Sequence, residues 1–178
     1  NQDITKIEVV DVLGNVVLLN TKNESKVKLN LADMPNGNYF VSIKHRNHIG
    51  IMSESALAFN GCANTLLDLT TSSPVYTNPL ISNPPRRVIG SKYTMWSGDA
   101  NNNKNIKYNG LSSDKDKILT SLGGSSFVNG ILSGIYRVED CNMDGAVKYN
   151  NLNNDRLIVL DNVGINTPNN IINQHTPN

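Results

Sequence analysis

The chain has 178 residues, a formal net charge of +1 and an apolar fraction of 38%, enough for one domain or two small ones with a modest core. The near-zero charge, without any basic run, makes nucleic acid a poor candidate for a partner. Membrane insertion is equally disfavoured, since no apolar run approaches the ~20 residues of a spanning helix.

Composition also bears on location. Abundant Asn, Ser, Thr and Gly suit an exposed, β-rich extracellular protein. No N-terminal signal peptide is recognised, so we expect a mature protein or an excised piece of a longer one. The two cysteines, Cys62 and Cys141, leave two interpretations open: one disulfide bond, or two free and partly buried thiols.

The first seventy residues alternate apolar and polar side chains with a period of two, as half-buried strands do. Strands are predicted around Ile7–Val9, Val27–Leu31, Tyr39–Ile43, Ile49–Met52, Ala56–Phe59 and Leu66–Leu69, with turns at Gly14-Asn15, Thr21–Ser25 and Pro35-Asn36-Gly37. Short strands at this spacing predict an immunoglobulin-like β-sandwich over residues 1–71. The alternation then stops, and Pro74, Pro79, Pro84 and Pro85 mark residues 72–95 as a linker or connecting segment.

Beyond this segment one polar stretch occurs twice, as GDANNNKNIKYNG (98–110) and EDCNMDGAVKYNN (139–151). Asp99 and Asp140 are 41 residues apart, and so are Asp114 and Asp155. Repeated structural units keep such a register, whereas low-complexity tracts do not. Each stretch is followed by a helical apolar pattern that ends at glycine: Ile118, Leu119 and Leu122 before Gly123-Gly124, and Leu157, Ile158, Leu160 and Val163 before Gly164.

Side-chain oxygens recur at alternate positions of both loops. Counting Asp99 and Asp140 as position 1, positions 3 and 5 are Asn101 and Asn103 in loop 1, and Asn142 and Asp144 in loop 2. Position 7 would offer the backbone carbonyl of Asn105 or Ala146. A hard cation that takes six to eight oxygens requires a cage of this kind, so we expect Ca²⁺ at two sites.

An aspartate at the start of each helix completes the pattern. Asp114 and Asp155 could cap the helix, close the cage as the last ligand, or do both. Their preservation in the repeat favours the ligand role. At position 8, Ile106 and Val147 are β-branched, and paired loops often join there through a short β-bridge and share a small core.

The two loops are not equivalent. Loop 2 has three carboxylates and Gly145 at the sharp bend of position 6. Loop 1 has two, with Asp116 a possible third, and carries Lys104 at the bend, where a positive φ costs on the order of 1 kcal/mol. We therefore predict that the Asp140–Asp155 site binds Ca²⁺ more tightly.

The pair GDANNNKNIKYNGLSSDKDKIL and EDCNMDGAVKYNNLNNDRLIVL resembles dockerin-type, EF-hand-like calcium-binding repeats with a lengthened loop, over residues 96–164. Such repeats are found in bacterial surface proteins exported by type IX secretion. MPNGNYFVSIKHRNHIGIMS looks like the β-rich segment before these repeats, and ITKIEVVDVLGNVV is similar to sorting-type β-domains of that route. Asn103 and Lys104 depart from the acid and the glycine of the pattern.

The resemblance implies a fold that is mainly β with a small α part, and a non-catalytic, calcium-stabilised structural or adhesion module on the bacterial cell surface. Its partners would be other domains of the same surface protein. The alternative is a docking or assembly module, which binds a cohesin-like partner or exchanges strands in a surface fibre.

Two further segments bear on this choice. His45 and His48 are three apart, and residues at that spacing on a strand face opposite sides, so we expect neither a metal pair nor an enzyme. Residues 165–178 are expected to be an extended tail, which either reaches another molecule or frays.

Overall fold

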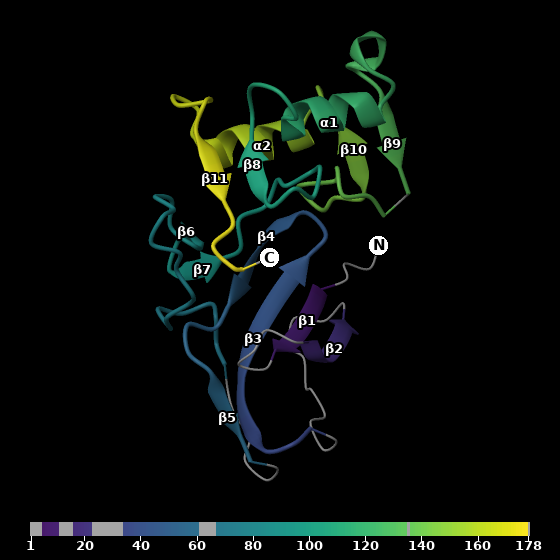
Figure 1. Ribbon diagram of the computed structural model, residues 1–178. Coiled ribbons are helices and arrows are strands. Elements are labelled where there is room, and N and C mark those ends of the chain that lie inside the picture. The colour runs from purple at the N-terminus through teal and green to yellow at the C-terminus, as the bar shows by residue number, and fades with distance from the viewer. Residues whose placement is uncertain (1–4, 11–15, 23–33, 61–66, 135, 178) are drawn as a thin grey trace. The chain divides into compact units, whose positions relative to one another are not determined.

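The computed structural model describes residues 5–10, 16–22, 34–60, 67–134 and 136–177, in two compact units. The β unit contains Ile4–His45, Gly50–Met95 and His175–Asn178. Among the described residues, the repeat unit contains Arg46–Ile49 and Trp96–Gln174. Both units are drawn in Figure 1.

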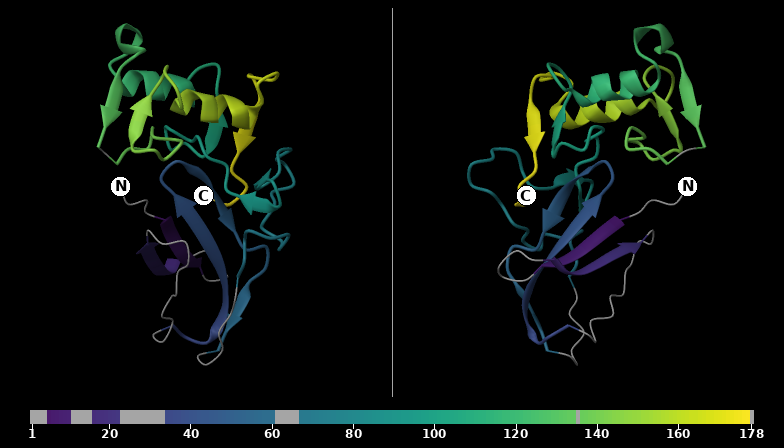
Figure 2. Two further views of the ribbon diagram at one scale, coloured as in Figure 1. Left: turned by 180° about the vertical axis from the view of Figure 1, so that it is seen from behind. Right: turned by 45° about the vertical axis from the view of Figure 1, so that its right-hand side comes forward.

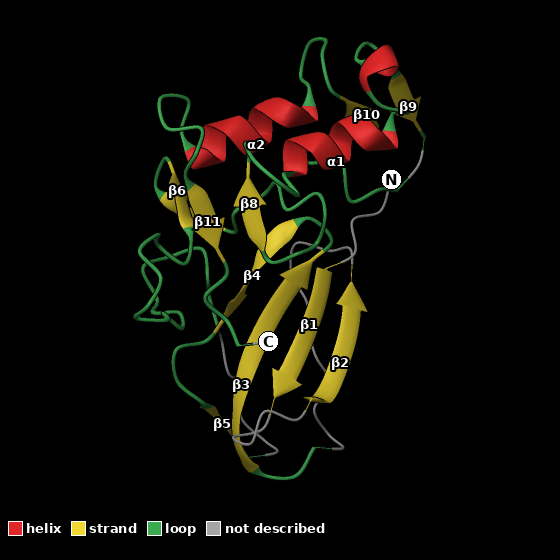
Figure 3. Ribbon diagram, turned by 45° about the horizontal axis from the view of Figure 1, so that its top comes forward, coloured by secondary structure: helices red, strands yellow, loops and turns green. Residues whose placement is uncertain are grey.

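The β unit is built on one five-stranded sheet. Its strands are β1 (Thr5–Val10), β2 (Val16–Lys22), β3 (Gly37–His45), β4 (His48–Met52) and β5 (Leu57–Phe59). The order is β2-β1-β3-β4, with β5 also paired to β3 (Figure 3). The antiparallel register of β1 on β3 places Ile7 opposite Ile43 and Val9 opposite Val41. The mainly β character of the chain is therefore confirmed.

The apolar face predicted for β3 is found, although Ser42 on its other face is buried as well. Tyr39 and Val41 are buried, and Ile43 packs against the small core of this unit, which contains Ile51, Leu69 and Val75. Burying alternate residues of a strand removes one face from water and leaves the other solvated. This periodicity explains why the sequence located β3 correctly.

Other predictions for this unit fail or lie outside the described residues. No strand is found at 67–69, because the Asp68 carboxylate accepts from the Thr70 amide at 2.9 Å and turns the chain. Thr21 and Lys22, expected in a turn at 21–25, belong to β2, and the rest of that segment lies outside the described residues. The strand predicted at Val27–Leu31 and Cys62 lie outside the described residues. The described strands form one main sheet, which does not confirm an immunoglobulin-like sandwich.

Residues 72–95 belong to the β unit and are not a loose linker. They include a hairpin of β6 (Arg87–Ile89) and β7 (Lys92–Thr94), joined at Gly90 with φ 59°. The buried Arg86 donates to the carbonyls of Leu69 at 2.6 Å and Ser73 at 2.7 Å. Gly90-Ser91, between two short runs with β-branched or aromatic residues, is a signal from which this hairpin could have been predicted.

After residue 95, the described part of the repeat unit contains two helices and four short strands. They are β8 (Asn105–Lys107), α1 (Asp114–Ser121), β9 (Ile131–Ser133), β10 (Ala146–Lys148), α2 (Asp155–Val163) and β11 (Ile171–Asn173), with a 3-10 turn at Ser125–Phe127. The amide of Gly124 donates to Leu119 and that of Gly123 to Thr120, and both glycines have positive φ. This arrangement ends α1 where the sequence predicted, and Gly164 does the same for α2.

The strands of the repeat unit pair in a crossed pattern. β9, which follows the first helix, pairs with β10 of loop 2, whereas β11, which follows the second helix, pairs with β8 of loop 1 (Figures 1 and 2). The expected β-bridge between the two loops is therefore wrong, because each loop strand pairs with a different partner. The expected shared core is confirmed, since Ile106 and Val147 are both fully buried in one cluster.

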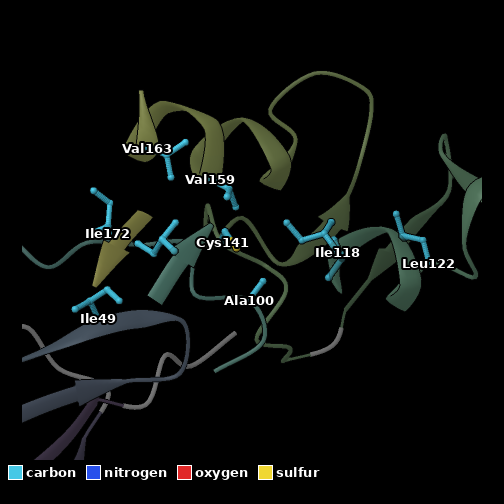
Figure 4. Packing of buried hydrophobic residues seen from close by; sticks show 10 residues of the cluster. Ile49, Ala100, Ile118, Leu122, Cys141, Val159, Val163 and Ile172 are labelled. Atoms are coloured by element: carbon cyan, nitrogen blue, oxygen red, sulfur yellow. The ribbon is translucent and has the colours of Figure 1, made fainter. Parts of the chain in front are cut away.

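This core draws on the whole repeat unit. Figure 4 shows side chains from α1, α2, both loops and β11 gathered together. The buried members are Ile49, Ala100, Ile106, Ile118, Leu122, Cys141, Val147, Val159, Val163 and Ile172. Cys141 is a free thiol, and its burial raises its pKa well above the ordinary value. It occupies position 2 of loop 2, as Ala100 does in loop 1.

In the part of the C-terminal segment that the structure describes, up to residue 177, the chain forms β11 and does not fray. Ile172 is buried opposite Ile106, and His175 is buried in the β unit, where its Nδ1 accepts from the Asn78 amide at 3.0 Å. The sequence did not predict β11, because its three residues are too few to show the alternation of a strand. None of the described helices has the length and apolar character that crossing a membrane requires.

Candidate metal centre

Loop 1 is closed by side-chain oxygens that accept from its own backbone. The two oxygens of Asp99 accept from the amides of Asn103 and Lys104, both at 2.9 Å. The side chains of Asn101 and Asn103 each accept from the amide two residues ahead, at 3.1 Å. These bonds wind residues 99–105 into a tight loop around the aspartate, as the spacing predicted.

Loop 2 repeats the same bonds. Asp140 accepts from the amides of Asp144 and Gly145, both at 3.1 Å. Asn142 accepts from Asp144, and Asp144 from Ala146, both at 3.0 Å. The repetition extends to the amide groups of the position 3 asparagines, which donate to the carbonyls of Ser112 and Asn153.

Asp114 and Asp155 join each loop to the helix that follows. The caps are the preceding residues, because Ser113 Oγ accepts from the Asp116 amide and Asn154 Oδ1 from the Leu157 amide. The capping alternative for the two aspartates is therefore wrong. Their carboxylates accept instead from the amides of positions 3 and 9, at 3.2 and 2.7 Å in loop 1 and at 3.2 and 2.8 Å in loop 2.

The bend at position 6 has the backbone that the sequence predicted. Lys104 has φ 70° and its counterpart Gly145 has φ 84°. A lysine in this region carries a steric cost of about 1 kcal/mol that glycine does not. Asn105 and Ala146, expected to offer carbonyls, are the first residues of β8 and β10, so the strands begin inside the loops.

The position 1 and closing aspartates are almost fully buried. Asp99, Asp114, Asp140 and Asp155 are each at most 2% exposed. Desolvation raises the pKa of Asp114 to about 7 and that of Asp155 to about 6, and it raises the pKa of Asp99 and Asp140 as well. The nearby charges of Asp99 and Asp140 add to the shifts of Asp114 and Asp155. Each loop thus concentrates buried acid in a small volume.

Two basic side chains form ion pairs with carboxylates of loop 2. Arg46 Nη2 lies 3.3 Å from Asp140 Oδ2, and Lys148 Nζ forms a short ion pair with Asp144. Although desolvation acts to raise the pKa of Asp144, hydrogen bonds from Lys148 and Ala146 hold it below its usual value. In loop 1 the counterpart of Lys148 is Lys107, which donates to the carbonyl of Leu111.

The turn at Arg46-Asn47 reaches position 1 of both loops. The buried Asn47 accepts on its carbonyl from the amide of Asp99 at 3.1 Å, and its side chain donates to the carbonyl of Asp140 at 2.6 Å. Sequence reasoning missed both residues, because they lie more than 50 residues before loop 1 and carry no local pattern. Lys148 could have been found, since it follows the acidic Asp144 by four residues.

Acidic side chains alone do not form a metal site in these loops. Among the described residues, no three His, Cys, Asp or Glu side chains are grouped closely enough to hold a metal ion. In each loop the structure instead brings together two buried aspartates with the amide oxygens at position 3. His45 and His48 lie on either side of the 46–47 turn, and His48 Nδ1 contacts Asn47 Oδ1.

Comparison with known proteins indicates where the protein is directed. Residues 1–53 match the family of secretion system C-terminal sorting domains. Such a domain marks proteins exported by type IX secretion, so the protein is directed to the cell surface or the extracellular space. Neither the curated proteins nor the solved structures contain a match, and dockerin-type repeats are not shown by these comparisons.

Proposed function

We propose that the protein is a non-catalytic, calcium-stabilised structural or adhesion module of a secreted bacterial surface protein, with the repeat unit as a dockerin-like pair and the β unit as an immunoglobulin-like domain. The observation that supports it best is the duplicated arrangement of buried aspartates in two loops with the same hydrogen bonds. The sorting-domain match supports the extracellular setting, where free calcium is plentiful.

The donor set suits calcium. Every candidate ligand is an oxygen, which favours a hard cation over zinc or copper. A carboxylate has about four acceptor sites. The oxygens of Asp99 each accept from one loop amide, and Asp140 accepts from one amide on Oδ1 and from an amide and Arg46 on Oδ2, so lone pairs stay available in both loops. The residues that would hold the ions are Asp99, Asn101, Asn103, Asn105 and Asp114 in loop 1, and Asp140, Asn142, Asp144, Ala146 and Asp155 in loop 2.

Calcium would supply the positive charge that buried carboxylates need. A buried charge is costly unless it is paired. Among the described residues, Asp99, Asp114 and Asp155 form no ion pair with Lys, Arg or His. The aspartates would thus be poorly stable as charged groups without a cation, and the pKa of about 7 at Asp114 expresses that cost.

Calorimetric unfolding of the full chain tests this function. We expect the transition temperature to rise in millimolar calcium and to fall with chelator, because a ligand that binds only the folded state stabilises it. Asp114→Asn and Asp155→Asn should each remove one part of this shift, and Asp161→Asn, at an exposed position of α2 outside both loops, serves as the control. A transition that chelator does not move would refute calcium stabilisation.

A docking module is the second candidate, and one observation favours it. Leu111 and Leu152 are 88% and 85% exposed, and they occupy equivalent positions after the two loops. Exposed leucines at matching places suit recognition by a protein partner, such as a cohesin-like domain. Donation of the C-terminal strand to a fibre is less well supported, because β11 already pairs within its own unit.

Light scattering on the calcium-loaded protein separates these functions. A monomer in both wild type and the Leu111→Ser/Leu152→Ser double variant, together with no binding to a panel of cohesin domains, would support the architectural function. Binding of a cohesin domain that the double variant loses would support docking instead.

A further inference from the structure

Arg46 lies against the first aspartate of loop 2. Its Nη2 is 3.3 Å from Asp140 Oδ2, and the two side chains are only 6% and 2% exposed. The guanidinium carbon lies 4.0 Å from the ring centroid of Tyr136, within the range of a cation–π contact. The guanidinium is therefore held in place by a carboxylate and an aromatic ring, both in the repeat unit.

The contact with Arg46 uses only one of the two carboxylate oxygens of Asp140. Asp140 Oδ2 accepts from Arg46 and from the Gly145 amide, whereas Oδ1 accepts from the Asp144 amide. A cation that enters the loop can thus bind Oδ1 while Arg46 still holds Oδ2. The arginine and the cation would then share one carboxylate.

Loop 1 has no equivalent of this arrangement. Asp99 Oδ2 accepts from the Lys104 amide, as Asp140 Oδ2 does from Gly145. Within the part of the chain that the structure describes, however, no arginine or lysine side chain forms an ion pair with Asp99. Asn47 contacts position 1 of both loops, whereas Arg46 contacts only that of loop 2. Of the two turn residues, Arg46 is therefore the one that makes the loops differ.

We propose that Arg46 is the built-in counter-ion of loop 2, which neutralises Asp140 when no calcium is bound and lowers the affinity of that loop for calcium. The inference rests on the calcium-binding function proposed above. It makes loop 2 the loop that keeps its shape without a cation, and loop 1 the loop that depends on one. The advantage that three carboxylates give to loop 2 is correspondingly reduced.

Simple electrostatics gives the size of the effect. A unit positive charge about 6 Å from a divalent cation in water lowers its affinity by about tenfold. Removing the charge of Arg46 should therefore raise the calcium affinity of loop 2 about tenfold. The same change leaves Asp140 buried without its partner, so the calcium-free protein should lose stability.

Isothermal titration of the full chain with calcium tests the proposal, with three variants at Arg46 and Lys44 and with Asp114→Asn to identify the step of loop 1. Arg46→Gln removes the charge, Arg46→Lys keeps it, and Lys44→Gln removes the same charge from the β unit. We expect one of the two binding steps to tighten about tenfold in Arg46→Gln only, and the step assigned to loop 1 by Asp114→Asn to stay unchanged. An Arg46→Gln affinity equal to or below that of wild type would overturn the proposal.

A kinetic measurement covers a variant that unfolds without calcium. Stopped-flow mixing of the calcium-loaded protein with chelator starts from the folded state in every variant, so it reads the repulsion directly. Slower calcium release from Arg46→Gln than from Arg46→Lys supports the proposal, and equal or faster release refutes it. If wild type binds no calcium at all, the proposed function fails, which is a different result from two sites that Arg46 does not affect.

Discussion

The backbone amide of Gln174 donates to the carbonyl of Lys104 at 2.9 Å. The amide of Gly134 donates at 3.1 Å to the carbonyl of Gly145, the equivalent position of loop 2. Each loop is thus fixed at its bend by the strand that follows the helix of the other repeat. The two loops differ in sequence at the bend but receive the same support.

The C-terminal strand should be essential for the repeat unit. Ile172 is 7% exposed and its neighbour Ile171 is 42% exposed. We expect Ile172→Ala to lower the free energy of unfolding by about 2–4 kcal/mol, because it removes a buried side chain from the core. Ile171→Ala is the matched control and should change it by about 0.5 kcal/mol or less. Urea denaturation of both variants measures the difference, and equal effects would contradict the burial of β11.

Lys104 should act through both its backbone and its charge. Lys104→Gly relieves the positive φ and should stabilise the calcium-free protein by about 1 kcal/mol. Lys104→Gln keeps the strain and removes the charge, so it should lack the stability that glycine gains from the bend. Both should bind calcium more tightly at loop 1. If glycine gives no more stability than glutamine in chelator, strain at this bend is not a factor.

The pH dependence of the calcium-free protein should have an unusual sign. Desolvation raises the pKa of Asp114 to about 7 and that of Asp155 to about 6, from an ordinary value of 3.8. The folded state therefore binds protons more tightly than the unfolded state. This contribution is complete below about 3.8 and is lost as the pH rises through about 6 to 7.

Urea midpoints in chelator should accordingly be higher at pH 5 than at pH 8. Calcium should reverse the trend, because its ligands must be ionised. The Asp114→Asn/Asp155→Asn double variant should show a flatter profile in chelator. A midpoint that is the same at both pH values in wild type would argue against proton binding by these aspartates.

Mutations at adjacent residues should distinguish helix capping from cation binding. Ser113 caps α1 through its hydroxyl, so Ser113→Ala should cost about 1 kcal/mol in calcium and in chelator alike. Asp114→Asn, one residue later, should lose the calcium response of loop 1. Differential scanning fluorimetry with and without calcium distinguishes the two, and an equal loss of the calcium response in both would mean that the cap holds the site.

Local patterns account for what the sequence could predict. The period of two located β3, the spacing of apolar residues before glycine located both helices, and the register of the two loops placed Lys104 at a positive φ. These features depend on residues a few positions apart. Arg46 and β11 act over 94 residues and about 65 residues respectively, and no pattern in one sequence shows which distant segment will pair.

The crossed strands also fix the number of repeats. In a stacked array each unit contacts only its neighbours, so evolution can lengthen the array by adding copies. Here β11 returns to the loop that opens the series, and both loop strands already have partners. A copy added after α2 would either displace β11 from β8 or stand outside this exchange of strands, so the two repeats form a closed pair.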